Sequence, residues 1–166
     1  MPDPAIQRFF GTLLIEATLD DPRADRDAAI ARVVALAEAH TGDASAPTQP
    51  RFRWAAHAET LELSAVTARP LSAAPGGFWT AHLFRGPADA TGTVLIEDPR
   101  IATLGAVTSG LAFREPGSQP MPAIHKAGVR AGGLVMVPAY VRCGIEAHDS
   151  DRAQHWLVVK LTPQRV

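Results

Sequence analysis

Six histidines and one cysteine are the residues of this chain best suited to bind a transition metal or to attack a substrate. The histidines are His40, His57, His82, His125, His148 and His155. No two of them stand two or four residues apart, so no strand or helix presents a local pair of imidazoles to one metal ion. A metal site would have to assemble from distant strands, and the ordinary interpretation of each histidine is a core or surface residue.

The single cysteine, Cys143, follows the apolar stretch GGLVMVPAYVR within residues 132–144. As a nucleophile it would need a lowered pKa and a neighbouring base, and no spacing in the sequence supplies either. A lone cysteine at the end of a strand is more often a small buried apolar residue. One cysteine also excludes an internal disulfide, which fits a cytoplasmic protein.

The elements that must position these residues begin with a strand and a helix. Residues 9–19 are rich in β-branched side chains and are followed by a turn sequence, which predicts a strand. Residues 24–40 repeat apolar side chains at helical spacing, with Asp25 or Asp27 suited to cap the first turn. The apolar stripe of this predicted helix consists of Ile30, Val33, Val34 and Ala37.

From residue 51 onward, short apolar runs alternate with Gly and Pro turns, which predicts a mostly β sandwich or barrel. Residues 114–133 contain three prolines and four glycines and predict a long loop at a rim or over a pocket mouth. The connector at 41–50 is too short to divide the chain. We therefore expect one domain over residues 1–166.

Composition excludes several classes of function. The chain has 166 residues, 46% of them hydrophobic, with 16 Lys plus Arg against 17 Asp plus Glu. This balance creates no field that would attract nucleic acid or an anionic membrane surface. No apolar run approaches the length of a membrane span, and the first residues lack the pattern of a signal peptide. We expect a soluble protein in the cytoplasm.

Three stretches in order resemble the small bacterial putative 2-oxoglutarate/Fe(II)-dependent oxygenases. IQRFFGTLLIEATLDD is similar to their opening strand, and APGGFWTAHLFRGPADATGTVLIEDPR (74–100) to their central block. GGLVMVPAYVRCGIEAHDSDRAQHWLVVKL (132–161) is similar to their closing block. The resemblance implies a double-stranded β-helix, of jelly-roll or cupin-like type, with the helix of residues 24–40 packed outside.

The resemblance also implies where a site would lie. In such enzymes two imidazoles and usually a carboxylate hold Fe(II), and an Arg grips 2-oxoglutarate. The matching positions here hold Ser72 and Ala74 for the first ligands and Cys143 for the last histidine. Only the Arg position is kept, as Arg152. We expect Ser72 or Ala74 to converge with Cys143 and Arg152 at one end of the barrel, with Arg152 binding a carboxylate and with no metal or cofactor held.

Three hypotheses follow, and they leave enzymatic activity open. The favoured one is a pseudoenzyme, an oxygenase-like domain without iron that binds a small molecule or a protein, a homodimer included. The second is an active dioxygenase using Fe(II) and 2-oxoglutarate, with unconventional ligands drawn from His82, His125, His148 or His155. The third is a metal-free enzyme that uses Cys143. Nucleic acid and membranes are not expected partners.

Overall fold

The computed structural model describes residues 5–9, 12–19, 25–42, 52–99 and 123–165 of the chain. The elements in chain order are β1 (Ala5–Phe9), β2 (Thr12–Thr18), α1 (Arg26–Ala39), β3 (Phe52–Leu63), β4 (Arg69–Ser72), β5 (Trp79–Phe84), β6 (Thr91–Glu97), β7 (Ile124–Arg130), β8 (Gly133–Pro138), β9 (Cys143–Ile145) and β10 (Gln154–Arg165). No helix in these ranges has the length and apolarity that crossing a membrane requires.

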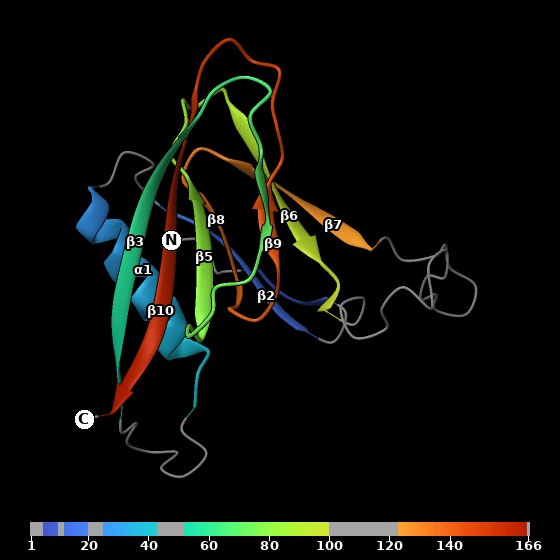
Figure 1. Cartoon of the computed structure of the whole chain (residues 1–166). Helices are drawn as coiled ribbons and strands as arrows, with labels where there is room; N and C mark the ends of the chain where they lie inside the picture. Colours follow the sequence, from blue (N-terminus) through green and yellow to red (C-terminus); the bar gives the residue numbers. More distant parts are fainter. Residues whose placement is uncertain (1–4, 10–11, 20–24, 43–51, 100–122, 166) are drawn as a thin grey trace.

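The strands form two antiparallel sheets (Figure 1). The larger sheet has the order β1-β2-β8-β5-β10-β3, and the smaller has the order β4-β9-β6-β7. From β3 onward the chain passes repeatedly from one sheet to the other, so that strands distant in sequence become neighbours. This path is a double-stranded β-helix of jelly-roll type, which confirms the predicted fold class.

Apolar side chains from both sheets fill the space between them. The larger sheet contributes Leu14, Phe84, Val135, Val137 and Trp156, and the smaller contributes Val94, Ile96, Ala127, Val129, Cys143 and Ile145. The rings of Phe84 and Trp156 pack with centroids 4.9 Å apart. Alternation along the strands produces this inner core, because every second residue points to the same side of a sheet.

Helix α1 covers the other face of the larger sheet, as predicted (Figure 1). Asp25 caps it by accepting a hydrogen bond of 2.7 Å from the backbone N–H of Ala28. The fully buried stripe is Ala29, Val33, Leu36 and Ala37. Ile30 and Val34, which the sequence placed in the stripe, pack at its margin. The larger sheet is thus covered on both faces, and every residue of β5 is buried.

The predicted loop over residues 114–133 is wrong for its described part. Residues Ile124–Arg130 form β7, which pairs with β6; residues 114–122 lie outside the described ranges. Ala127 and Val129 point into the core, while Lys126 and Arg130 are exposed. A strand with so few apolar residues carries little of the signal that predicts strands from sequence.

Replacing Gly92 should destabilise the protein, whereas replacing Gly128 on the neighbouring strand should not. A Cβ added at Gly92 would lie 2.4 Å from Cζ2 of Trp156, whereas one at Gly128 would meet nothing within 4 Å. Gly92→Ala is therefore expected to lower the free energy of unfolding by about 1–3 kcal/mol through overpacking. Gly128→Ala should change it by less than about 0.5 kcal/mol, as exposed substitutions usually do. Urea unfolding of both variants checks this, and equal effects would contradict the packing described here.

Candidate functional site

A polar patch interrupts the inner face of the larger sheet. On β5, Trp79, Ala81 and Leu83 pack toward α1, so Thr80 and His82 must turn inward. In the sequence WTAHLF, the first, third and fifth residues face the helix, and the second, fourth and sixth therefore face the other sheet. Thr80 is 8% exposed and His82 is 3% exposed, so both polar side chains are buried.

Strand register extends this patch across the sheet. Val158 of β10 lies opposite His82 of β5 and Glu59 of β3. Two residues farther along β10, Lys160 lies opposite Thr80 of β5 and His57 of β3. These residues form two adjacent rows on one face, because directly opposed residues of antiparallel strands point to the same side.

The smaller sheet supplies the facing wall. Ser72 of β4 pairs with Cys143 of β9, and Arg69 pairs with Ile145. Three residues apart on a regular strand would face opposite sides, but the register shifts between Arg69 and Ser72, and a bulge re-aims side chains in this way. Gly144 permits the close pairing, since a Cβ there would lie 2.6 Å from the carbonyl oxygen of Arg69.

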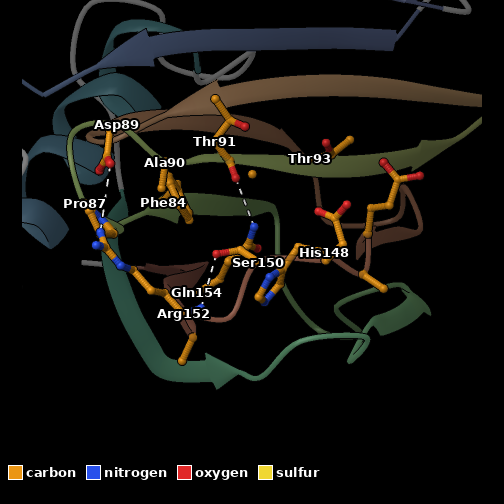
Figure 2. Close-up of a pocket in the computed structure, with 15 residues that line it drawn as sticks. Phe84, Pro87, Asp89, Ala90, Thr91, Thr93, His148, Ser150, Arg152 and Gln154 are labelled. Atoms are coloured by element: carbon orange, nitrogen blue, oxygen red, sulfur yellow. Dashed lines mark hydrogen bonds and ion pairs between the residues drawn. The ribbon is translucent and has the colours of Figure 1, made fainter.

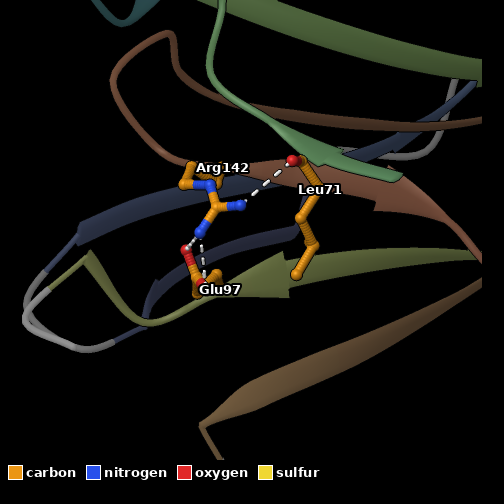
Figure 3. A network of polar contacts seen from close by, with 3 residues as sticks. All are labelled: Leu71, Glu97 and Arg142. Carbon is orange, nitrogen blue, oxygen red and sulfur yellow. Dashed lines mark hydrogen bonds and ion pairs between the residues drawn. The ribbon is translucent and has the colours of Figure 1, made fainter. Parts of the chain in front are cut away.

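An ion pair holds β4 in place (Figure 3). Arg142 donates from Nη1 to both carboxylate oxygens of Glu97, at 3.0 and 2.8 Å, and from Nη2 to the carbonyl of Leu71 at 3.2 Å. Glu97 ends β6 and Leu71 belongs to β4, so this arginine links the two strands on either side of β9. It is a positioning contact for the wall that carries Arg69 and Ser72.

These walls line a half-open cavity of about 190 Å³, here called the inner cavity. Its lining comprises His57, Glu59, Arg69, Ser72, Ala73, Ala74, Thr80, His82, Cys143, Val158 and Lys160. A single water needs only about 10–15 Å³ of such space, so the cavity has room for a small organic molecule. It includes three of the residues predicted to converge: Ser72, Ala74 and Cys143.

His82 is the most buried polar group of the inner cavity. Burial, reinforced by the nearby charge of Arg69, lowers its pKa from 6.5 to about 4. The ring is therefore neutral at pH 7, with one nitrogen as donor and the other as acceptor. Within the described ranges, neither ring nitrogen has a hydrogen-bond partner.

Arg69 is only half engaged. Its Nη2 donates to Oε2 of Glu59 at 3.0 Å, and the two side chains are 27% and 51% exposed, respectively. Its Nη1 is buried and, among the described residues, has no partner. The hydroxyl of Thr80 is in the same condition. Arg69, Thr80 and His82, which together carry four buried polar atoms without a partner among the described residues, thus line one cavity.

Cys143 is buried, and burial raises the pKa of its thiol to about 12. At neutral pH it is therefore a protonated thiol and not the thiolate that attacks substrates or binds metals. This environment does not favour the hypothesis of a cysteine nucleophile.

Arg152 does not join the other three predicted residues. It lines a second cavity of about 460 Å³, bounded by the turn after β5, by β6 and by residues 146–154 (Figure 2). Its Nη1 lies 3.9 Å from Oδ2 of Asp89, and both side chains are at least 74% exposed. The expectation that Arg152 faces Cys143 is thus not met: it stands in the segment before β10, whereas the inner cavity is reached by Val158 and Lys160 farther along that strand.

The second cavity is larger, but fewer of its buried polar atoms lack partners. The amide of Gln154 is engaged at both ends, donating to Thr91 O at 3.0 Å and accepting from Trp156 Nε1 at 3.1 Å (Figure 2). Nε2 of His148 lies 3.0 Å from Leu63 O, which leaves Nδ1 of that ring as the buried atom without a partner among the described residues. Its chemistry is therefore less distinctive than that of the inner cavity.

The residues of the inner cavity do not fit an Fe(II) site. A facial site needs two imidazoles and a carboxylate, or comparable ligands, directed at one point. At the matched positions Ser72 offers a hydroxyl, Ala74 a methyl group and Cys143 a protonated thiol. The lining also holds the imidazoles of His82 and His57 and the carboxylate of Glu59, but His57 and Glu59 lie on β3, which β10 separates from His82 on β5. Across the described ranges, no group of three His, Cys, Asp or Glu side chains is arranged to hold a metal ion.

Of the four histidines considered as unconventional ligands, only His82 lines the inner cavity. His125 lies on β7, His148 lines the second cavity, and His155 is exposed on β10. Sequence reasoning missed Arg69, Glu59, Thr80 and Lys160 as cavity residues. The alternation of β5 could have predicted that Thr80 faces the cavity. The inward turn of Arg69 could not be predicted, because it depends on a bulge that no local sequence pattern indicates.

No protein-family model matches the chain, and no curated protein matches its sequence. Among solved structures the chain is similar to SnoK, a non-heme alpha ketoglutarate dependent carbocyclase from nogalamycin biosynthesis, with 13% identity over 89% of this chain and 78% of that one, at a TM-score of 0.46. It is also similar to RmlC from Streptococcus suis, solved with dTDP-D-xylose, with 10% identity over 96% and 70% of the two chains, at a TM-score of 0.38. The fold described above rests on strand order and not on these similarities.

The burial of His82 should make stability fall in mild acid. The unfolded chain binds a proton at this residue below pH 6.5, whereas the folded chain does so only near pH 4. Stability from this group is therefore complete above pH 6.5 and is lost as the pH falls toward 4, by about 3 kcal/mol in total. Urea unfolding from pH 7.5 to 4 should show a steeper loss for the wild type than for His82→Gln. Parallel curves for the two proteins would refute the burial of a neutral imidazole.

Proposed function

We propose that this protein is an oxygenase-like double-stranded β-helix domain that works without iron and binds a small polar molecule in the inner cavity. The observation that carries the proposal is that Arg69, Thr80 and His82, each with a buried polar atom that has no partner among the described residues, line one cavity. Buried polar groups in folded proteins are nearly always hydrogen-bonded, and exceptions call for an explanation. A bound molecule that supplies those partners is such an explanation.

Hydrogen bonding is the energetic argument for a ligand. A buried polar group left without a partner costs about 1–3 kcal/mol, and a ligand that offers acceptors or donors to several of these groups would satisfy them. The cavity of about 190 Å³ is smaller than the roughly 300–1,000 Å³ of most ligand pockets. The expected ligand is therefore a compact polar molecule and not a nucleotide or an extended chain.

A second candidate is an active Fe(II) and 2-oxoglutarate dioxygenase with unusual ligands. One observation favours it: both nitrogens of His82 lack partners within the described ranges, and the residue lines the cavity. The second imidazole and the carboxylate of the lining, from His57 and Glu59, lie on β3, two strands away from His82. Among the described residues these groups are not arranged to chelate Fe(II) in a facial site. We therefore place this candidate second and test it directly.

The first test concerns Thr80. Thr80→Val replaces a buried hydroxyl that has no partner among the described residues by a methyl group of similar size. It is expected to raise the free energy of unfolding by about 1 kcal/mol, at the expense of ligand binding. Thr162→Val is the matched control, because that hydroxyl donates to Gly76 O at 3.3 Å and its loss should not stabilise. If Thr80→Val destabilises the protein as its control does, the hydroxyl is satisfied and the proposal loses its support.

The second test concerns iron. After anaerobic reconstitution with Fe(II) and desalting, metal analysis is expected to find no stoichiometric iron. Incubation with 2-oxoglutarate should release no succinate above a blank without protein. One equivalent of iron, or succinate above the blank, would favour the dioxygenase, and loss of that signal in His82→Ala would identify its imidazole as a ligand.

A further inference from the structure

The guanidinium of Arg69 lines the inner cavity and is only partly paired by Glu59. We infer that the ligand of the cavity presents a carboxylate to Arg69, in competition with Glu59. This inference rests on the proposed binding function and adds the chemical class of the ligand. It assigns two roles that the sequence did not suggest. Arg69 is the anion-binding residue, and Glu59 is an internal carboxylate that occupies one side of the same guanidinium.

The geometry at Arg69 supports this assignment. A guanidinium carries its donors in a planar fork that matches the two oxygens of a carboxylate. Glu59 engages only Nη2, at 3.0 Å, while Nη1 of this cavity-lining residue is buried and has no partner among the described residues. Arginine nitrogens are donors only, so the ligand atom that meets Nη1 must be an acceptor.

The other groups of the cavity extend this donor character. Thr80 can donate through its hydroxyl, and neutral His82 can donate through one ring nitrogen. Both are buried and without partners among the described residues. An oxyanion can accept from several donors at once, and hydrogen bonds to a charged acceptor are about twice as strong as those between neutral groups.

The net charge of the cavity lining also favours an anionic ligand. The charged side chains that line the inner cavity are Arg69, Lys160 and Glu59, which leaves one positive charge in excess. Lys160 donates to the carbonyl oxygen of Pro75 at 3.5 Å, in the loop that follows β4. A cationic ligand would meet two cations and one carboxylate that is already paired with Arg69, whereas an anionic ligand balances the excess positive charge.

Glu59 is suited to act as a competitor because it is weakly held. Its side chain is 51% exposed, against 27% for Arg69, and an ion pair with one exposed member contributes little in water. Glu59 can therefore turn into solvent when a ligand carboxylate arrives. The cavity should therefore bind anions less tightly than it would if the carboxylate of Glu59 were absent.

The test compares propionate with its neutral isostere propionamide, at constant ionic strength and pH 7.5, by NMR titration of the full-length protein. Propionate is expected to bind the wild type and propionamide to bind much more weakly. Glu59→Gln should strengthen propionate binding roughly two- to fivefold, the range set by a partly exposed ion pair. Arg69→Gln should weaken it roughly tenfold or more, by loss of a charge-assisted pair. Glu62→Gln, an exposed position on the same strand, is the control and should change nothing.

Several results would overturn the inference. They are equal binding of the two isosteres, no gain in Glu59→Gln, a gain of equal size in Glu62→Gln, or no propionate binding to either the wild type or Glu59→Gln. Glu59→Gln keeps the test decisive if Arg69→Gln does not fold, because it predicts a gain. Binding of propionamide with the affinity of propionate would reject the carboxylate and keep the proposed function. A destabilised Thr80→Val would instead reject the proposed function itself.

Discussion

The antiparallel register between β5 and β10 is the constraint on which the candidate site depends. It sets Val158 opposite His82 and Lys160 opposite Thr80, and the alternation of strand side chains then turns all four to the same face. A slip of one residue would turn His82 toward helix α1 and bring Leu83 inward. The apolar cluster between the larger sheet and helix α1 prevents that slip, because Trp79, Ala81 and Leu83 must pack under the helix. The apolar face of β5 thereby positions its polar face.

Polar groups in such a place reduce stability unless something satisfies them. The rest of the space between the sheets is filled by side chains such as Phe84, Trp156 and Ile96, and apolar residues at positions 80 and 82 would extend that core. Buried polar networks that are only partly satisfied are less favourable than an apolar core. Departures of this kind from local consistency concentrate at functional sites. The disagreement between Thr80, His82 and their surroundings is therefore informative about function, whereas the larger second cavity shows less of it.

Much of the fold and part of the site could be predicted from the sequence. The helix over 26–39 and most strands carry strong periodic patterns, and the matched blocks brought Ser72 and Cys143 into one cavity. Two features could not be predicted. β7 has few apolar residues, and the inward turn of Arg69 depends on a bulge in the pairing of β4 with β9. Arg152 shows the opposite error: a spacing counted along the chain does not say where its side chain lies, since the inner cavity begins only at Val158.

The cavity also reverses the electrostatic arrangement of the site that the resemblance suggested. In a metal site the protein supplies lone pairs and the ion supplies the positive charge. Here the positions matched to the ligands hold Ser72, Ala74 and the protonated thiol of Cys143. Arg69 adds a guanidinium on the same wall as Ser72, and His82 presents a neutral imidazole on the opposite wall. The positive charge is already covalently part of the protein, on Arg69, and no added cation is needed to attract an anion. The ligand that we propose for this cavity brings the lone pairs itself, so a double-stranded β-helix would here hold an acceptor in place of a metal ion.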